Sequence, residues 1–165
     1  MTIPEYPLEK VMDIKKKRVD EAEKVVAAKK RELEAEREKL RKCEEERDKA
    51  VQHKIDKLNQ LRDELDRGTT TDKIQQMKNY LKVVEERVLV EQKKVQEQEE
   101  QVNIAKRNLE IAQEELKMRR QEVDKLQNHK KDWIKQMKRE LELAEEREMD
   151  EIGQVLYLRN MRDAP

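Results

Sequence analysis

Residues 66–72 read DRGTTTD, and this is the one segment between Leu8 and Ala164 that interrupts a helical pattern. Gly68 suits the left-handed conformation that ends many helices, and Thr71 before Asp72 is a good N-cap with an acid in the first turn. The three prolines all lie near the ends of the chain. The sequence therefore predicts a helix over about 8–66, a turn at 67–72 and a second helix over about 72–159.

After this turn, apolar residues recur in alternating steps of three and four. The row, which we call the seam, keeps its register for nine heptads with four polar interruptions among nineteen positions. Its members are Ile74, Met77, Leu81, Val84, Val88, Glu91, Val95, Gln98, Val102, Ala105, Leu109, Ala112, Leu116, Arg119, Val123, Leu126, Lys130, Trp133 and Met137. A seam of this length predicts a left-handed supercoil.

The seam of the first helix is less regular. It includes Val19, Ala22, Val26, Lys29, Leu33, Glu36, Leu40, Cys43 and Arg47, and then a four-residue stutter leads to Val51, Ile55, Leu58 and Leu65. Because the turn is short, the helices should be antiparallel, with facing residue numbers that sum to about 138. The fold class predicted is all-α, an elongated two-helix antiparallel coiled-coil hairpin, and residues 1–165 form one such domain.

The second helix should project beyond the first. Helix from about Trp133 to Leu158 has no intramolecular partner in this arrangement, a length of roughly 35–40 Å. It nevertheless has an apolar stripe, formed by Leu141, Ala144, Met149, Ile152 and Leu156. An apolar stripe without a partner in the chain indicates binding to another protein or to a second copy.

Composition supports a coiled coil and excludes an ordinary globular core. Charged residues make up 47% of the chain and hydrophobic residues 35%, with no Phe. Lys+Arg and Asp+Glu are both 39, so the net charge is zero, and the apolar residues are periodic. Balanced charge with a regular apolar row is typical of long packed helices rather than of disorder.

Several kinds of site are excluded or disfavoured. Two glycines cannot build a Gly-rich phosphate loop, and a single cysteine, Cys43, forms no disulfide framework. His53 and His129 are too far apart to share a metal and should face solvent. A two-helix hairpin has no pocket to perturb a carboxylate, so we expect no enzyme activity, metal or cofactor. No apolar run approaches a membrane span, and the first residues lack a basic-then-apolar signal pattern, so we expect a cytoplasmic protein.

Charge is segregated along the second helix. Residues 117–139 have nine Lys/Arg and three Asp/Glu, whereas residues 140–151 have seven acids and one Arg. Lys15 to Arg18 should lie opposite the basic part and complete a basic collar, followed by an acidic tip. Such a pattern can orient a helix within a ring or socket, although charge runs on coiled coils are often only solvated faces. Nucleic acid is a weaker partner, because aromatic residues do not interleave with the basic ones and the nearby acids repel phosphate.

Trp133 occupies a seam position at the open end of the predicted hairpin. Tyr6 or Leu8 could cover it there, so that the indole closes the end of the core. The alternative is an aromatic anchor that faces a partner.

The two ends of the chain resemble the FliJ/YscO family of flagellar and type III secretion export proteins, in particular its YscO-like members in chlamydial type III systems. The resemblance lies in Asp13-Ile14, Lys17 and Val19 to Ala22, and in the run from Met149 to Gln154. It implies a cytoplasmic stalk or adaptor at the base of the secretion apparatus, which binds and stimulates a hexameric export ATPase. An export-gate protein and secretion chaperones are further implied partners, with contact to the membrane only through the apparatus.

The residues expected to bind partners lie in the collar and the tip. They are Lys15, Lys16, Lys17, Arg18, Arg119, Arg120, Lys130, Lys131, Trp133, Met149, Asp150, Glu151, Ile152 and Gln154. Two alternatives remain at this point: a self-associating structural coiled coil and a chaperone that binds secreted substrates directly. A stalk should bind as one copy per six ATPase subunits, whereas a scaffold should form a stable homodimer alone.

Overall fold

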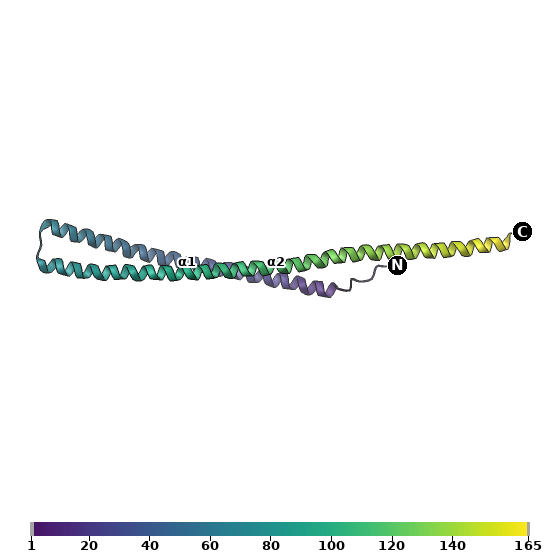
Figure 1. Ribbon diagram of the computed structural model, residues 1–165, viewed down its shortest axis with the longest axis horizontal. Helices are drawn as coiled ribbons and strands as arrows, with labels where there is room; N and C mark the ends of the chain where they lie inside the picture. The colour runs from purple at the N-terminus through teal and green to yellow at the C-terminus, as the bar shows by residue number, and fades with distance from the viewer. Residues whose placement is uncertain (1, 165) are drawn as a thin grey trace. The chain divides into compact units, whose positions relative to one another are not determined.

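The computed structural model describes residues 2–164, which form two helices (Figure 1). Helix α1 spans Glu9–Arg67 and helix α2 spans Thr71–Asp163, with 59 and 93 residues. Gly153 lies within α2 and does not interrupt it. The predicted all-α fold, a two-helix hairpin with a longer second helix, is confirmed.

The helices are joined by residues 68–70, and the details of this linker follow from its side chains. Gly68 has a φ of 79°, the left-handed conformation that glycine adopts without strain. The hydroxyl oxygen of Thr70 accepts a hydrogen bond from the Lys73 N–H at 3.4 Å. The N-cap is therefore Thr70, and the prediction of Thr71 was wrong by one residue. A cap side chain reaches the N–H three positions on, and Thr71 is already the first residue of α2.

The chain divides into two compact units. One combines the start of the chain up to Ala22 with the part from Glu115 onward, and the other is Glu23–Glu114. Each unit contains part of α1 and part of α2, so each has its own set of contacts between the two helices.

In the Glu23–Glu114 unit, α1 and α2 pack antiparallel. The Gln98 side chain donates a hydrogen bond to the main-chain oxygen of Glu36 at 3.0 Å. Nearer the linker, Lys73 pairs with Glu64 at 3.3 Å. Both pairs have residue numbers close to the expected sum of about 138. The buried centre of this unit contains Leu33, Val102 and Ala105, with Leu40 and Leu109 packed against them.

The seam of α2 is confirmed position by position. All nineteen residues of the row from Ile74 to Met137 are buried or half-buried. Within that range, only Glu122 and Ile134 are also shielded from solvent. A strict alternation of three and four residues keeps one face of a supercoiled helix against its neighbour, which is why the pattern alone located these residues.

The predicted stutter in α1 was wrong at Ile55 and Leu65, whereas Val51 and Leu58 are half-buried as predicted. Ala50 is 3% exposed, whereas Ile55 and Leu65 are 44% and 49% exposed. The seam continues from Arg47 in unbroken steps of three and four, through Ala50, Lys54, Lys57, Leu61 and Glu64, which are buried or half-buried. The prediction followed the largest apolar side chains, but the helix face is set by spacing, and a small alanine lets the two backbones approach.

In the other unit, the residues before α1 fold against α2. Tyr6 and Met12 are buried. The Tyr6 ring contacts Trp133 edge-on, with 5.4 Å between ring centroids, and the Tyr6 hydroxyl is hydrogen-bonded to Nδ1 of His129. The prediction that Tyr6 covers Trp133 is thereby confirmed. Residues 2–6, at the purple end of Figure 1, form no helix.

This cover extends further along α2 than the sequence suggested. Ile3, Met137, Leu141 and Ala144 are half-buried, whereas every residue from 145 to 164 is exposed. The uncovered part of α2 therefore starts near residue 145 rather than at Trp133. An extended chain advances about 3.3 Å per residue, roughly twice the rise of a helix, so a few residues before α1 span several turns of α2.

Candidate protein-interaction surface

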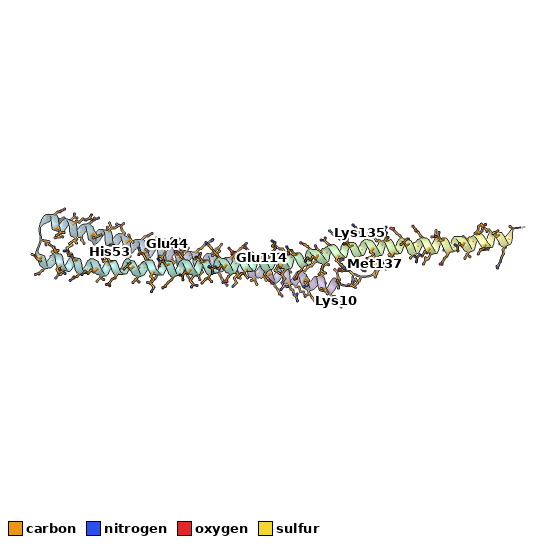
Figure 2. All side chains as sticks on the ribbon, in the orientation of Figure 1. Lys10, Glu44, His53, Glu114, Lys135 and Met137 are labelled. Carbon is orange, nitrogen blue, oxygen red and sulfur yellow. The ribbon has the colours of Figure 1, made fainter. Side chains whose placement is uncertain are left out.

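The C-terminal segment of α2, residues 145–164, is helical to Asp163 and exposed throughout. Figure 2 shows its side chains, at the yellow end of the ribbon, with no other segment beside them. Seven of its large apolar side chains are 50–69% exposed: Met149, Ile152, Val155, Leu156, Tyr157, Leu158 and Met161. This density of exposed apolar groups makes the segment a candidate protein-binding surface.

The apolar side chains of this segment lie on two faces of the helix. At about 100° per residue, Met149, Ile152 and Leu156 line one face, and Tyr157, Leu158 and Met161 lie on the opposite side. A single partner helix would cover only one of these faces. A helix that is apolar on most of its circumference is normally surrounded, so this segment fits a socket better than a flat surface.

Polar residues of the tip also face solvent. Asp150, Glu151 and Gln154 are exposed and alternate with the apolar groups. Together with the acids from Glu140 onward, they give the start of the C-terminal segment a negative surface. A socket for this segment should therefore combine apolar walls with basic groups near its entrance.

Part of the basic collar stabilises the fold. Nζ of Lys15 lies 3.2 Å from Glu122, and Nζ of Lys130 lies 2.8 Å from Glu9. Arg119 pairs with Glu115 at 2.9 Å and with Glu122 at 3.5 Å. The hydrogen bond from Lys15 lowers the pKa of Glu122, and the charge of Arg119 adds to this effect against the opposing influence of burial. Lys15 and Lys130 join α1 to α2, whereas Arg119 pairs within α2, and all three cations are half-buried.

The remaining collar residues face solvent. Lys16, Lys17, Arg18 and Lys131 are exposed and have no ion-pair partner among residues 2–164; Arg120 is also exposed. A shallow groove lies on this side of the unit, lined by Lys16, Val19, Asp20, Arg120, Val123 and Asp124. The positive charge available to a partner is thus smaller than the sequence count suggested, because neighbouring acids pair with at least three of the eight collar cations.

Trp133 is half-buried beneath Tyr6 and presents only part of its indole to solvent. Its indole therefore helps to cover the open end of the contact between α1 and α2.

The predicted site lacked four exposed apolar residues of this segment, Val155, Tyr157, Leu158 and Met161. The run Val155-Leu156-Tyr157-Leu158 contained the signal, because four consecutive apolar residues of a helix cannot all lie on one face. A single stripe at coiled-coil spacing includes Met149, Ile152 and Leu156 but leaves out the apolar residues on the opposite face of the helix.

His129 faces solvent as predicted, whereas His53 is half-buried, and each is hydrogen-bonded to a tyrosine. Nε2 of His53, labelled in Figure 2, lies 3.1 Å from the Tyr80 hydroxyl, and His129 is bonded to Tyr6. Cys43 is a half-buried free thiol. Within residues 2–164, no group of three or more His, Cys, Asp or Glu side chains is arranged to hold a metal ion. In the same range, neither helix has a stretch long and apolar enough to cross a membrane.

The fold and the uncovered end of α2 define a coiled-coil hairpin protein whose longer helix has one unpartnered end. Comparison with known proteins assigns it more narrowly. The sequence profile of YscO-like proteins matches residues 3–163, so the chain belongs to the YscO-like family, a family of structural adaptor proteins associated with type III secretion.

Two solved structures are similar to the chain. CT670 from Chlamydia trachomatis, described as a YscO homolog, has 48% sequence identity and a TM-score of 0.93, over 98% of this chain and 99% of that one. A chain from the Chlamydia pneumoniae CdsV and CdsO protein complex has 49% identity and a TM-score of 0.48, over 50% of this chain and 96% of that one. No curated protein matches the sequence. The resemblance to YscO-like proteins of chlamydial type III systems, expected from the two ends of the sequence, is confirmed.

Proposed function

We propose that this protein is a cytoplasmic stalk or adaptor of a type III secretion apparatus, which binds the hexameric export ATPase and stimulates it. An export-gate protein and secretion chaperones are further proposed partners. The observation that supports this most is the C-terminal segment, which has twenty exposed residues, is helical to Asp163 and is apolar on two faces. Membership of the YscO-like family supports a place in a type III secretion apparatus.

A hexameric ring suits the geometry of this segment. Six equivalent subunits around an axis form a socket that contacts a central helix from all sides, so both apolar faces become buried. Because the helix is asymmetric, it contacts the six subunits unequally and can favour one nucleotide state over another. Stimulation in this scheme is a shift among states of the ATPase, and all catalytic groups belong to the ring.

The exposed cations of the collar act at longer range. Lys16, Lys17, Arg18 and Lys131 can attract acidic loops at the mouth of the ring and orient the protein before the apolar faces are buried. This contribution falls with salt, because exposed charges are screened over about 8–10 Å at physiological ionic strength.

The test uses the full chain and the purified hexameric ATPase of the same secretion system. We expect one chain per six ATPase subunits in sedimentation, together with an increase in ATP hydrolysis. Ile152→Ser and Leu158→Ser, one on each apolar face, should each weaken binding by about tenfold or more, since each removes a buried aliphatic side chain.

Leu89→Ser is the matched control, because Leu89 is similarly exposed on α2 but lies in the other unit. All three variants should melt at the wild-type temperature. Unchanged binding by both tip variants would contradict the socket, and equal loss in the Leu89 control would show that the tip is not the specific contact. Binding to unfolded secreted substrates in place of the ATPase would instead support a direct chaperone.

A further inference from the structure

A second apolar row runs along α2 in the Glu23–Glu114 unit, on a face that α1 does not cover. Val83, Val90, Ile104 and Ile111 follow a spacing of seven, with Glu97 at the one polar position between them. We call these five residues the outer row. Its four apolar members are 46–68% exposed.

Neighbouring rows of α2 show that this pattern is specific to one face. The row one residue earlier is Lys82, Leu89, Gln96, Asn103 and Glu110, with one apolar member. The row two residues later is Glu85, Gln92, Glu99, Lys106 and Gln113, with none. In a chain with few apolar residues, four at one repeated position require a physical reason, and burial against another helix supplies one.

The outer row is half of a second coiled-coil seam. Interleaved with it at steps of three and four are Tyr80, Arg87, Lys94, Gln101 and Asn108, all exposed. At about 100° per residue, this seam lies roughly 110° around α2 from the seam that faces α1. A further helix can therefore pack on α2 without displacing α1.

We propose that the outer row is an interface with a second copy of this chain, in which the two α2 helices pack antiparallel about a two-fold axis. The charges on this face select that partner. In one register, Glu97 lies opposite the partner's Lys94, and by symmetry Lys94 lies opposite the partner's Glu97. The single polar member of the outer row thereby acquires an ion pair, with a lysine that also lies 3.6 Å from Glu91 of its own chain.

The flanking charges agree with the same register. Coiled-coil geometry places Lys93 beside the partner's Glu100 and Glu86 beside the partner's Arg107, each twice by symmetry. Glu86, Lys93, Glu97, Glu100 and Arg107 are exposed and form no ion pair among the described residues of the single chain. Ile111 meets the ring of the partner's Tyr80 at both ends of the interface.

Other registers oppose like charges. A shift of one heptad in one direction places Lys93 against the partner's Lys93, and in the other direction Glu100 against the partner's Glu100. A parallel arrangement would place Glu97 and Lys94 against their own copies. The face is thus self-complementary in one antiparallel register, as expected for a two-fold interface.

The size of the interface indicates the affinity expected for the dimer. Tyr80 to Ile111 spans about 47 Å of helix, and a contact about 10 Å wide buries roughly 1,000 Å² over both copies, the lower limit for specific association. We therefore expect a reversible dimer with a Kd in the micromolar range. The interface uses no residue of the collar or the tip, so it is independent of the function proposed above.

Analytical ultracentrifugation of the full chain from about 5 to 500 µM tests this. Wild type should shift from monomer to dimer, and Lys93→Glu or Glu100→Lys should each weaken the dimer by about fivefold or more, since each creates two repulsive contacts. The double variant Lys93→Glu/Glu100→Lys should recover wild-type affinity, because the pair is restored with reversed sign.

Two controls make the result specific. Ile111→Ser should weaken the dimer, whereas Leu89→Ser, at a similarly exposed residue outside the outer row, should not. Glu99→Lys and Lys106→Glu, on another face, should leave it unchanged. A monomer at all concentrations, failure of the double variant to recover, or equal weakening by the controls would overturn the proposal.

Discussion

The ring of Tyr6 meets the indole of Trp133 edge-on, with 5.4 Å between centroids and 62° between ring planes. The same tyrosine is hydrogen-bonded to His129, and the Glu9–Lys130 pair lies one turn away. These contacts fasten the residues before α1 to α2, although more than a hundred positions of sequence separate them. They also decide where the uncovered part of α2 starts.

Tyr6→Ala should weaken this attachment. The side chain is buried, and its loss removes a ring contact and a hydrogen bond, which costs about 2–4 kcal/mol. The chain has one tryptophan, so the fluorescence of Trp133 during urea unfolding reports on this region. Tyr157→Ala, at an exposed tyrosine, is the control and should leave the midpoint unchanged. A wild-type midpoint for Tyr6→Ala would show that the ring contact contributes nothing.

The sequence predicted regular packing well and irregular packing poorly, for a physical reason. Helical periodicity identified every seam position of α2, because steps of three and four residues return to the same face of a supercoiled helix. Residues 2–6 have no periodicity, so only the placement of Trp133 suggested that Tyr6 could reach it. The rise of an extended segment then determines how much of α2 it covers, and a residue count based on helices underestimated that length.

The unbroken seam of α1 leads to a paired prediction at Ala50 and Ile55. Ala50→Glu should lower the free energy of unfolding by about 2–4 kcal/mol, because it places a charge at a buried position between the helices. Ile55→Glu should change it by no more than about 0.5 kcal/mol, because that side chain already faces solvent. Thermal melts followed by circular dichroism separate the two. If Ile55→Glu were the more destabilising variant, the α1 seam would instead follow the predicted stutter.

The candidate site was predictable in part for a similar reason. Met149, Ile152 and Leu156 fit one helical stripe and were found. Tyr157 and Leu158 lie outside that stripe, and a single-face search could not include them. The ion pairs of Lys15, Arg119 and Lys130 depend on which acids the fold brings opposite, and charge counts do not contain that information.

Stability should depend on Glu122 at acid pH. The hydrogen bond from Lys15, with a further contribution from Arg119, lowers the pKa of Glu122 below its usual 4.5 in the folded chain. A lowered folded pKa contributes stability that is complete above about pH 4.5 and is lost as pH falls through the folded value. Glu122→Gln should therefore reduce the melting temperature above pH 5 and have little effect near pH 3.

The control for this prediction is Glu148→Gln, at an exposed carboxylate that has no ion-pair partner among residues 2–164. Its melting curves should follow wild type at both pH values. If Glu122→Gln melted at the wild-type temperature at pH 7, the Lys15–Glu122 pair would contribute no net stability.

Charge reversal separates the collar's role in binding from its role in folding. Lys16 and Lys17 are exposed and unpaired within the described chain, whereas Lys15 and Arg119 hold carboxylates of α2. Lys16→Glu/Lys17→Glu should therefore leave the melting temperature unchanged and weaken both association with the export ATPase and its stimulation. The loss should be largest at low salt, because exposed charges act over about 8–10 Å or less near physiological ionic strength. Lys78→Glu/Lys82→Glu changes the net charge equally at exposed sites in the other unit and should preserve stimulation. If the Lys16/Lys17 variant stimulated the ATPase as well as wild type at low ionic strength, the collar would be a solvated face, and binding would depend on Met149, Ile152 and their neighbours alone.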